Sequence, residues 1–403
     1  MARVLYVTIP AEGHVNPTLG LVKQLVENGE EVVYMCSEEY RGRLVQTGAQ
    51  FRAYQTDDQA IREIGSDPRE FKHPLHFIDF ILRGIIEPRL ADILKQTEND
   101  SFDYLIFDSM LGWGGTILGE KLGIPTICSV THFAFTEPLS HVVELFDPSG
   151  LDIGTLHERV TTTLRRIAGT YNVPVPALED ITLQYGQLKV IFTSREFQPN
   201  ADMLDDSYFF TGPSISPRHD APSFPLEQLR SQYDKVVYIS MGSILTRDFE
   251  LYKLCFEAFR EVPAQFVLSY GRDTNLESLG DDIPSNFIIK PFVPQLEVLR
   301  HTDAFITHAG MNSASEGLFN DVPLVMIPLS SDQPLVAKRV EELGAGIVLD
   351  RSQLTTEALK SALLQVLSDA SYKQHAKQIG GSLRNAGGYQ KAAERIQSLF
   401  SKV

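Results

Sequence analysis

Residues 292–333 read FVPQLEVLRHTDAFITHAGMNSASEGLFNDVPLVMIPLSSDQ, and this stretch decides the fold. Within it, residues 304–307 form a short apolar run that stops at His308. Such a run is typical of a buried parallel strand. Gly310 follows closely and permits a sharp turn. The stretch therefore predicts a strand that ends in a His-Ala-Gly loop, the first half of a strand–helix unit.

Polar residues favour a helix start directly after this loop. Asn312 and Ser313 are good N-cap residues, and Ser313 to Glu316 has the S-x-x-E spacing of a capping box. A helix that starts there would point its N–H groups and positive dipole end at whatever lies above the strand. Phosphate groups bind at such helix ends. The motif therefore predicts a site for a pyrophosphate.

The two flanks of the motif extend this predicted site. Phe292 lies in a Pro-bounded loop and either offers a ring face to a base or serves as an ordinary loop anchor. Asp332 and Gln333 follow a second apolar run, residues 323–329, at its carboxyl end. Ligands of open α/β sheets bind at that end of the strands. Base, phosphate and sugar would then each have residues along one surface.

The order of these motifs resembles the donor-binding signature of family 1 glycosyltransferases, which are nucleotide-sugar-dependent enzymes of GT-B fold. The matching pattern is [FW]-x-P-Q, then T-H-x-G-x-N-S-x-x-E-G, then D-V-P and D-Q. An N-terminal GHVNP turn, a central GP-containing linker and a helical tail also match, so the resemblance covers the whole chain. Within the family it resembles bacterial members that glucosylate macrolides, phenolics and flavonoids.

The resemblance implies a set of donor-binding residues in the second half of the chain. His308 would donate to the leaving pyrophosphate, and its Gly, Asn and Ser neighbours favour this over a core histidine. Glu316 fits either the capping box or the ribose-binding carboxylate of the family, and we favour the ribose. Ser243 would donate to a phosphate or be a plain turn residue. The full expected set is Gly242, Ser243, Phe292, Val293, Gln295, His308, Gly310, Asn312, Ser313, Glu316, Asp332 and Gln333.

His14 lies between a predicted first strand, residues 4–9, and a predicted helix, residues 18–28. Asn16 and Pro17 resemble an N-cap and a first helical residue, which would leave His14 in a turn. It could take a proton from an acceptor hydroxyl, or it could bond a nearby backbone carbonyl. The residues alone do not decide between these roles. The resemblance implies a catalytic base, because the general base of the family occupies this GH position.

Asp108 ends another apolar run, residues 104–107, where an unpaired carboxylate is costly to bury. Taken alone, Asp108 followed by Ser109 indicates a cap of the next turn. The resemblance implies a different role for Asp108, which would hold His14 by a hydrogen bond and stabilise the imidazolium that forms.

Strands alternate with helices along the rest of the chain, which predicts an α/β fold with doubly wound parallel sheets. In the first half we expect strands at 31–35, 126–130 and 190–193, and largely helical segments at 59–99 and 138–168. After a Pro- and Ser-rich segment the pattern restarts. We expect strands at 235–240, 265–270 and 286–290 and helices at 249–260 and 389–402.

The resemblance implies a GT-B fold, in which two Rossmann-like domains have parallel sheets that face each other across a cleft. We expect an N-terminal acceptor-binding domain at 1–209 and a linker at 210–232. A C-terminal nucleotide-sugar-binding domain would follow at 233–385, and a helix at 386–403 would pack back on the first domain.

Composition excludes several classes of protein. The chain has 403 residues, 43% hydrophobic and 22% charged, which suits a globular protein of two domains. Its net charge of −16 argues against nucleic acid and anionic membranes as partners. Three scattered cysteines, Cys36, Cys128 and Cys255, indicate a reducing compartment. With neither a signal peptide nor a membrane span in sight, we expect a cytoplasmic protein, either a monomer or a weak dimer.

The motifs that are missing narrow the chemistry further. The first turn, IPAEGHVNP, lacks the G-x-G-x-x-G fingerprint, which disfavours hydride transfer. A D-x-D triplet is also missing, so a metal-clamped GT-A transferase is disfavoured, and we expect neither a metal nor a cofactor. Two other classes stay open: a non-transferring UDP-sugar enzyme, such as an epimerase or hydrolase, and a UDP-sugar-binding module.

The resemblance implies inverting transfer of a hexose to a hydroxyl of a small lipophilic acceptor, and only the resemblance favours glucose as the sugar and UDP over dTDP as its carrier. Five aromatic residues, one of which closely follows Asp108, would line the acceptor pocket, although aromatics in such positions are more often core. These are Phe77, Phe80, Trp113, Phe133 and Phe135. Acceptor pockets are formed by variable loops, so the sequence does not identify the acceptor.

Overall fold

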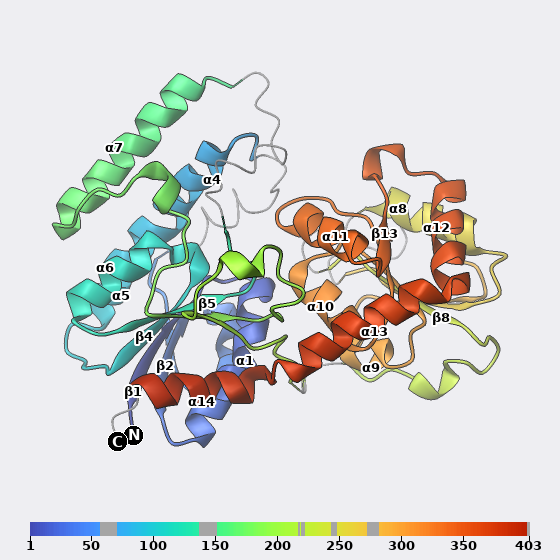
Figure 1. Cartoon of the computed structure of the whole chain (residues 1–403), viewed down its shortest axis with the longest axis horizontal. Helices are drawn as coiled ribbons and strands as arrows, with labels where there is room; N and C mark the ends of the chain where they lie inside the picture. Colours follow the sequence, from blue (N-terminus) through green and yellow to red (C-terminus); the bar gives the residue numbers. More distant parts are fainter. Residues whose placement is uncertain are drawn as a thin grey trace. The chain divides into compact units, whose positions relative to one another are not determined.

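The computed structural model of the protein describes residues 1–56, 71–136, 151–216, 218, 222–242, 248–271 and 282–400. Contacts divide the chain into two compact units. The first unit combines Met1–Ile215 with Ala386–Val403, and the second is Ser216–Asn385. Each unit is an α/β domain built around one parallel sheet (Figure 1).

Seven strands among the described residues form the sheet of the first unit, in the order β3-β2-β1-β4-β5-β6-β7. They are β1 Arg3–Val7, β2 Glu31–Cys36, β3 Gln50–Ala53, β4 Tyr104–Asp108, β5 Thr126–Val130, β6 Leu188–Ile191 and β7 Tyr208–Phe210. All neighbouring pairs are parallel; for example, Val4 lies between Val32 and Tyr104. The order reverses between β1 and β4, as in doubly wound Rossmann sheets.

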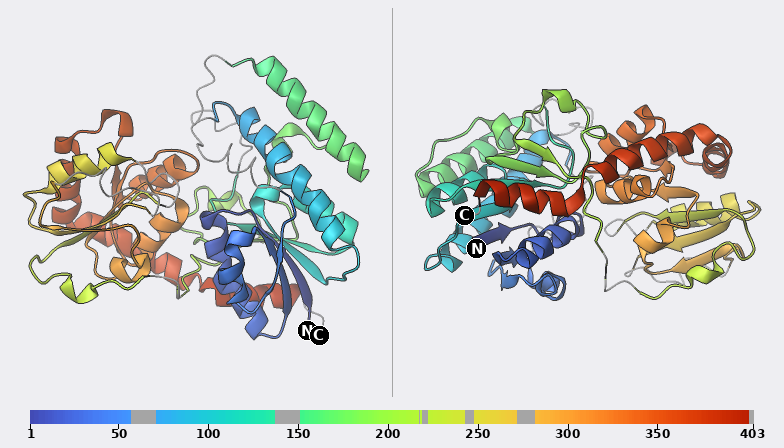
Figure 2. Two further views of the ribbon diagram at one scale, coloured as in Figure 1. Left: turned by 180° about the vertical axis from the view of Figure 1, so that it is seen from behind. Right: turned by 60° about the horizontal axis from the view of Figure 1, so that its bottom comes forward.

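Helices cover both faces of this sheet (Figure 2). They are α1 Glu12–Glu27, α2 Arg41–Val45, α4 Pro74–Phe80, α5 Glu87–Gln96, α6 Trp113–Leu122, α7 Ile153–Tyr171 and α14 Gly388–Phe400. Alternate side chains of β1 separate the two cores: Val4 and Tyr6 pack with α1, α2 and α14, while Leu5 and Val7 pack with α4–α7. Since both faces are buried, the strands are continuously apolar.

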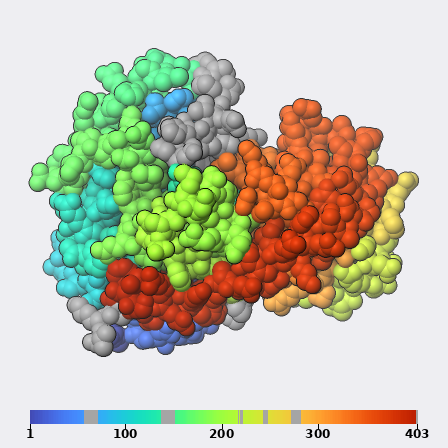
Figure 3. Space-filling view, viewed as in Figure 1, coloured from blue at the N-terminus to red at the C-terminus, as the bar shows by residue number. Residues whose placement is uncertain are grey.

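The C-terminal helix α14 belongs to the first unit and is visible on its surface in Figure 3. It approaches α1 so closely that a Cβ atom on Gly20 would lie 2.7 Å from the Tyr389 ring. Ala392, Ala393 and Ile396 are buried in the shared core. The missing side chain of Gly20 therefore lets two helices that lie far apart in sequence pack together.

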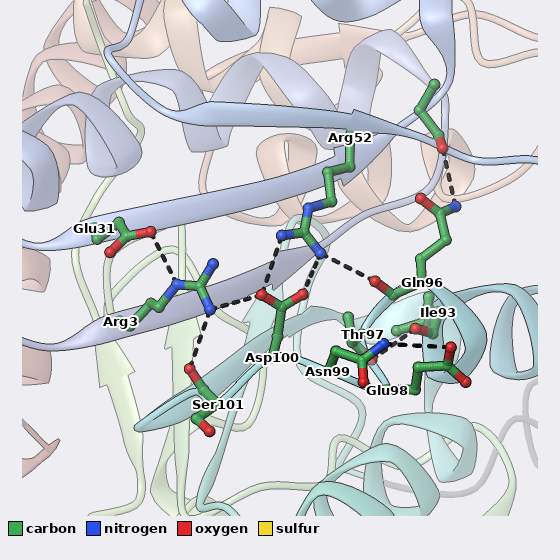
Figure 4. Close-up of polar contacts among 11 residues, drawn as sticks. Arg3, Glu31, Arg52, Ile93, Gln96, Thr97, Glu98, Asn99, Asp100 and Ser101 are labelled. Atoms are coloured by element: carbon green, nitrogen blue, oxygen red, sulfur yellow. Dashed lines mark hydrogen bonds and ion pairs between the residues drawn. The ribbon is translucent and has the colours of Figure 1, made fainter.

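A charged network fixes the amino end of the central strand, as Figure 4 shows. Arg3, the first residue of β1, donates to Asp100 at 2.7 Å and to Glu31 at 2.9 Å. Arg52 of β3 also donates to Asp100, and these bonds hold the pKa of the Asp100 carboxyl below its usual range. The network thus ties the amino ends of β1 and β2 to β3 through the carboxylate of Asp100.

The second unit has a six-stranded sheet among its described residues, in the order β10-β9-β8-β11-β12-β13. The strands are β8 Val236–Ser240, β9 Gln265–Ser269, β10 Phe287–Lys290, β11 Ala304–Thr307, β12 Leu324–Met326 and β13 Gly346–Val348. Its helices are α8 Phe249–Phe259, α9 Gln295–Leu299, α10 Met311–Phe319, α11 Gln333–Glu342, α12 Thr356–Ser368 and α13 Ala370–Asn385. The sheet repeats the arrangement of the first unit, with its reversal between β8 and β11.

Most expected strands are present within one or two residues of their predicted bounds, and residues 126–130 and 304–307 match β5 and β11. Three strands were not predicted: β3, β7 and β13. The predicted helical segments at 59–99 and 138–168 fall partly outside the described residues, and their described parts include α4, α5 and most of α7. Within the described ranges, no helix combines the length and the hydrophobicity that crossing a bilayer requires.

Candidate functional site

The strand order directs attention to two places in the molecule. In doubly wound sheets, ligands bind outside the carboxyl ends of the strands where the order reverses. In the first unit this place lies above β1 and β4. His14 follows β1 in the chain, and Asp108 is the last residue of β4. In the second unit this place lies above β8 and β11. Gly242 follows β8, and His308 follows β11.

His14 and Asp108 form a close pair in the first unit. The imidazole Nδ1 of His14 lies 2.8 Å from Oδ2 of Asp108. The Asp108 side chain is fully buried, and the His14 side chain is 19% exposed. Because a carboxylate only accepts hydrogen bonds, Nδ1 carries the proton and Nε2 carries the basic lone pair. The pair thus presents one tautomer of an imidazole that can take up a proton.

Asp108 combines the two roles that the sequence suggested separately. Its Oδ1 accepts a hydrogen bond from the backbone N–H of Met110 at 2.8 Å, which caps the 3₁₀ turn Ser109–Leu111. Its Oδ2 faces His14 and also accepts from the hydroxyl of Thr8 at 3.3 Å. The capping bond fixes the carboxylate plane and leaves the other oxygen directed at the imidazole.

The predicted start of the first helix was wrong. Helix α1 begins at Glu12, and His14 lies in its first turn, because the amides of His14 and Val15 both donate to the carbonyl of Ala11. Asn16 does not cap a helix; it donates to Glu12 one turn earlier at 3.1 Å. Arg43 binds both of these side chains, which stabilises the early turn. The helical backbone therefore fixes His14.

Two threonines beside this pair escaped prediction from the sequence. Thr131, which follows β5, places its Oγ1 3.1 Å from His14 Nδ1. Thr8, which follows β1, binds Asp108, and both threonines are at least 95% buried. Their one sequence signal is a hydroxyl residue directly after an apolar strand. A residue in that position lies at the carboxyl end of the parallel sheet. A buried hydroxyl there needs a hydrogen-bond partner, which is how these two threonines come to contact the pair.

In the second unit, His308 fits between two glycines. A Cβ atom on Gly242 would lie 2.7 Å from its imidazole, and one on Gly310 would lie 2.5 Å from it. Gly242 also has a positive φ of 79°, which other residues rarely adopt. The sequence predicted both glycines for this site, and the structure shows that the imidazole occupies the space that larger side chains would fill.

The surroundings of His308 set its charge. Burial lowers the pKa of its imidazole to about 4, while a hydrogen bond to the backbone of Ser240 acts in the opposite direction. His308 is therefore neutral at pH 7. The next residue, Ala309, has a positive φ of 63°, and strain of this kind concentrates at functional sites.

The predicted capping box at the start of α10 was wrong. The helix begins at Met311 with Gly310 as its N-cap, and the carbonyl of Gly310 accepts from the amide of Ala314. Asn312 and Ser313 consequently lie inside the first turn, where both are half-buried. The helix begins three residues earlier than the capping box predicts, because the Gly310 backbone itself makes the first helical bond. The N–H groups of residues 311–313 lie in the first turn, where the helix itself supplies no acceptor for them.

Glu316 has partners other than Ser313. Its carboxylate forms an ion pair with Arg218 and accepts from Gln295 Nε2 at 2.7 Å. Gln295 in turn accepts from the hydroxyl of the buried Tyr238 at 3.2 Å. The Glu316 side chain is 5% exposed. Gln295 was expected at the donor site, whereas Arg218 lies in the Pro- and Ser-rich segment and gave no signal.

The remaining predicted donor residues lie at the same end of the second sheet. Phe292 is 40% exposed, whereas its neighbour Val293 is buried. Asp332 precedes α11 without capping it through its side chain. Gln333 is buried, and its Oε1 accepts from the amides of Leu329 at 2.8 Å and of Ser330 at 3.2 Å. Those bonds engage the amide oxygen of Gln333, so its Nε2 is the atom that can donate. Ser243 lies outside the described residues.

The five aromatic residues expected at the acceptor pocket differ in burial. Phe80 and Trp113 are 8% and 6% exposed and belong to the core, and Phe133 packs edge-on against Phe197. Phe77 and Phe135 are half-buried. Across the described part of the chain, no group of three or more His, Cys, Asp and Glu side chains is placed to hold a metal ion.

Comparison with known proteins defines the class of this molecule. Residues 179–382 match the model of the family described as UDP-glucoronosyl and UDP-glucosyl transferase. Two relatives from Bacillus subtilis (strain 168), YojK and YdhE, are both described as uncharacterized UDP-glucosyltransferases. YojK is 34% identical over 98% of this chain and 97% of its own length. YdhE is 36% identical over 99% of both chains.

A solved structure supports the same class. The glycotransferase of kitacinnamycin superimposes with a TM-score of 0.81 over 98% of both chains, at 26% sequence identity. The protein therefore has the GT-B fold expected from the sequence. Its chain belongs to the UDP-glycosyltransferase family, the family 1 glycosyltransferases, and it is a glycosyltransferase.

Proposed function

We propose that the enzyme moves a hexose, glucose from UDP-glucose, onto a hydroxyl of a small lipophilic acceptor, with inversion and without a metal. The described names of the two Bacillus relatives favour UDP-glucose as the donor. For the acceptor we propose a flavonoid, a phenolic or a macrolide, which is what the resemblance of the sequence motifs implies. The observation that carries the chemistry is the 2.8 Å contact between His14 Nδ1 and the buried Asp108 carboxylate.

In this mechanism His14 Nε2 takes the proton of the acceptor hydroxyl as the oxygen attacks the anomeric carbon. The bond from that carbon to the diphosphate oxygen breaks on the opposite face, and UDP leaves, which inverts the anomeric configuration. Asp108 stabilises the imidazolium that forms. A base on one face of the sugar and a leaving group on the other face are what a single displacement requires. Glycoside hydrolases instead use two carboxylates that flank the bond, and the proposed mechanism assigns no such pair.

The negative charge on the departing UDP would be met in the second unit. The N-terminal turn of α10 supplies backbone N–H groups and the positive end of a helix dipole. His308 would contribute as a neutral imidazole, because burial keeps its pKa near 4. Preorganised dipoles of this kind stabilise charge as it develops, so the proposal needs no metal ion.

Other parts of the donor and acceptor would use residues already described. Phe292 exposes a ring for the uracil, Glu316 would take the ribose, and Asp332 with Gln333 would bind the sugar. Phe77 and Phe135 are the aromatic residues with most surface to offer an acceptor. A cytosolic monomer or weak dimer completes the proposal; free, buried Cys36, Cys128 and Cys255 fit a reducing compartment.

Mass spectrometry of reactions with UDP-glucose, EDTA and a panel of phenolics, flavonoids and macrolides tests this function. We expect acceptor-plus-hexose products from the wild type and a rate about 10²–10⁴-fold lower from His14→Ala. Calorimetry should show similar affinity for UDP-glucose in both. His157→Ala, a change at an exposed histidine of α7, is the matched control.

Other outcomes would replace the proposal. UDP release without any conjugate would favour a hydrolase, and a changed sugar on UDP would favour an epimerase. Binding of UDP-glucose without turnover on any acceptor would favour a binding module. A His14→Ala enzyme that binds the donor poorly but keeps its turnover would show that His14 is not the base.

A further inference from the structure

Arg218 is a charged residue that contacts a predicted donor-binding side chain but has no part in the proposed chemistry. It lies at the beginning of the second unit, in the Pro- and Ser-rich segment, yet its guanidinium reaches Glu316 of α10, 98 residues away. Nη2 pairs with Oε1 of the carboxylate, and Nη1 lies 3.4 Å from Oε2. Exposure is 28% for the Arg218 side chain and 5% for that of Glu316.

Gln295 holds the other oxygen of this carboxylate. Its Nε2 donates to Glu316 Oε2 at 2.7 Å, and its own Oε1 accepts from Tyr238 at 3.2 Å. The Tyr238 ring stacks on Phe305 with 4.8 Å between centroids, which fixes the hydroxyl on the sheet. The carboxylate is therefore clamped between a rigid neutral donor on one oxygen and a cation on the other.

The Glu316 carboxylate has more hydrogen-bond acceptor positions than Arg218 and Gln295 occupy. A carboxylate has about four lone-pair positions, two on each oxygen. Among the described residues, Arg218 and Gln295 are the donors to Glu316, and each makes one short bond to a different oxygen. The contact at 3.4 Å is too long to count as a strong bond. One position on each oxygen remains, spaced for two hydroxyls of a vicinal diol.

We propose that Arg218 is a positioning residue that keeps the carboxylate of Glu316 aimed at both ribose hydroxyls, so that the enzyme selects ribonucleotide donors over 2′-deoxyribonucleotide donors. A 2′-deoxyribose would fill only one of the two positions. The other would stay unsatisfied beside a buried charge, and such losses are costly. The inference rests on the proposed function, because it takes Glu316 as the ribose ligand.

Calorimetric titration with UDP and with 2′-deoxy-UDP tests this inference without any transfer reaction. We expect the wild type to bind UDP at least about ten-fold more tightly than 2′-deoxy-UDP. Arg218→Met keeps the long aliphatic stem but removes the charge, and it should reduce that ratio to about two-fold or less. Arg218→Lys restores a cation and should recover part of the ratio.

The ratio is informative even if a variant folds less completely, since both affinities are measured on one preparation. Arg260→Met, which removes an exposed ion pair with Asp282 in the same unit, is the matched control and should keep the wild-type ratio. Equal loss of affinity for both nucleotides in Arg218→Met would make Arg218 a purely structural residue. Tighter UDP binding in that variant would mean that Arg218 competes with the ribose.

Failure of the proposed function gives a different pattern. A wild type that binds neither nucleotide would contradict the donor assignment itself. A wild type that binds both equally well would leave transfer from UDP-glucose intact but overturn the selectivity inferred for Glu316 and Arg218.

Discussion

Gly242 and His308 follow neighbouring parallel strands, and the imidazole lies in the space that a side chain on Gly242 would need: a Cβ atom there would lie 2.7 Å from both Nε2 and Cε1. The strand order places the two residues side by side, because β8 and β11 are hydrogen-bonded at the reversal point of the sheet. The missing side chain thus determines where the imidazole lies and how deeply it is buried. Two predictions depend on this relationship.

Replacing Gly242 by alanine should both destabilise the second unit and weaken UDP binding. The new methyl group meets the imidazole, and its backbone φ of 79° is strained for any other residue. Together these effects should lower the free energy of unfolding by about 2–4 kcal/mol. Urea unfolding and calorimetry measure both effects.

Gly123→Ala is the matched control for this substitution. Gly123 also has a positive φ, 68°, but a Cβ atom at this position would meet no atom of the described residues within 4 Å, so only backbone strain applies. We expect a cost of about 1 kcal/mol and unchanged UDP affinity. Equal effects of the two substitutions on both measurements would show that the contact with His308 is unimportant.

His308 should make the stability of the protein depend on pH. The unfolded chain takes up this proton near pH 6.5, whereas the folded chain takes it up near pH 4. Stability from this group is therefore fully present above pH 6.5 and is lost as the pH falls toward 4. Between pH 7 and pH 5 the loss is about 2 kcal/mol. Urea unfolding at both pH values measures it.

His308→Gln removes the titrating group and should reduce the loss between pH 7 and pH 5 by that amount. His157→Gln, at an exposed position on α7, provides the comparison and should behave as the wild type. If His308→Gln shows the full wild-type pH dependence, the neutral state assigned to His308 is incorrect.

Asp108→Asn should separate the catalytic role of Asp108 from its capping role. An amide of the same size no longer requires a proton on His14 Nδ1, so the tautomer and the imidazolium lose their support. We expect turnover to fall about 10²–10⁴-fold with UDP-glucose affinity unchanged. Steady-state kinetics and calorimetry test both parts.

The control for Asp108→Asn is another capping aspartate. Asp152 caps the start of α7 by accepting a hydrogen bond from the amide of Thr155. Its capping bonds involve Thr155 and no histidine. Asp152→Asn should leave turnover at the wild-type level. Comparable losses of turnover in both variants would assign the effect of Asp108 to folding rather than to proton transfer.

The sequence predicted the sheet elements best where burial alone determines them. Residues 126–130 and 304–307 are apolar runs with little alternative, and they form β5 and β11. The missed strands are less distinctive: β3 reads QFRA, and β13 has only three residues and starts with a glycine. Strands of this kind are specified by their neighbours in the sheet rather than by their own residues.

At the candidate site, the first residues of the helices and the contacts between residues far apart in sequence could not be predicted from the sequence pattern. Asn16 resembled a cap, but its contact with Glu12 formed instead, because side chains four residues apart meet on a helix. The pairs His14–Asp108 and Arg218–Glu316 join residues 94 and 98 positions apart. No spacing rule gives such pairs; the first came from family resemblance, and the second came from the structure alone.

Phe292→Ala should weaken UDP binding while leaving the fold intact. Phe292 is 40% exposed, so its removal costs less packing than the loss of a core residue would, whereas stacking on a base contributes about 1–3 kcal/mol, or roughly 5–150-fold in affinity. Phe292→Trp keeps a stacking surface and should bind UDP at least as tightly as the wild type. Leu399→Ala, at another exposed apolar residue, controls for lost surface hydrophobicity. Calorimetry with UDP and thermal unfolding measure the two effects separately. Equal UDP affinity in wild type and Phe292→Ala would remove Phe292 from the donor site, and its loop would then need another ligand for the base.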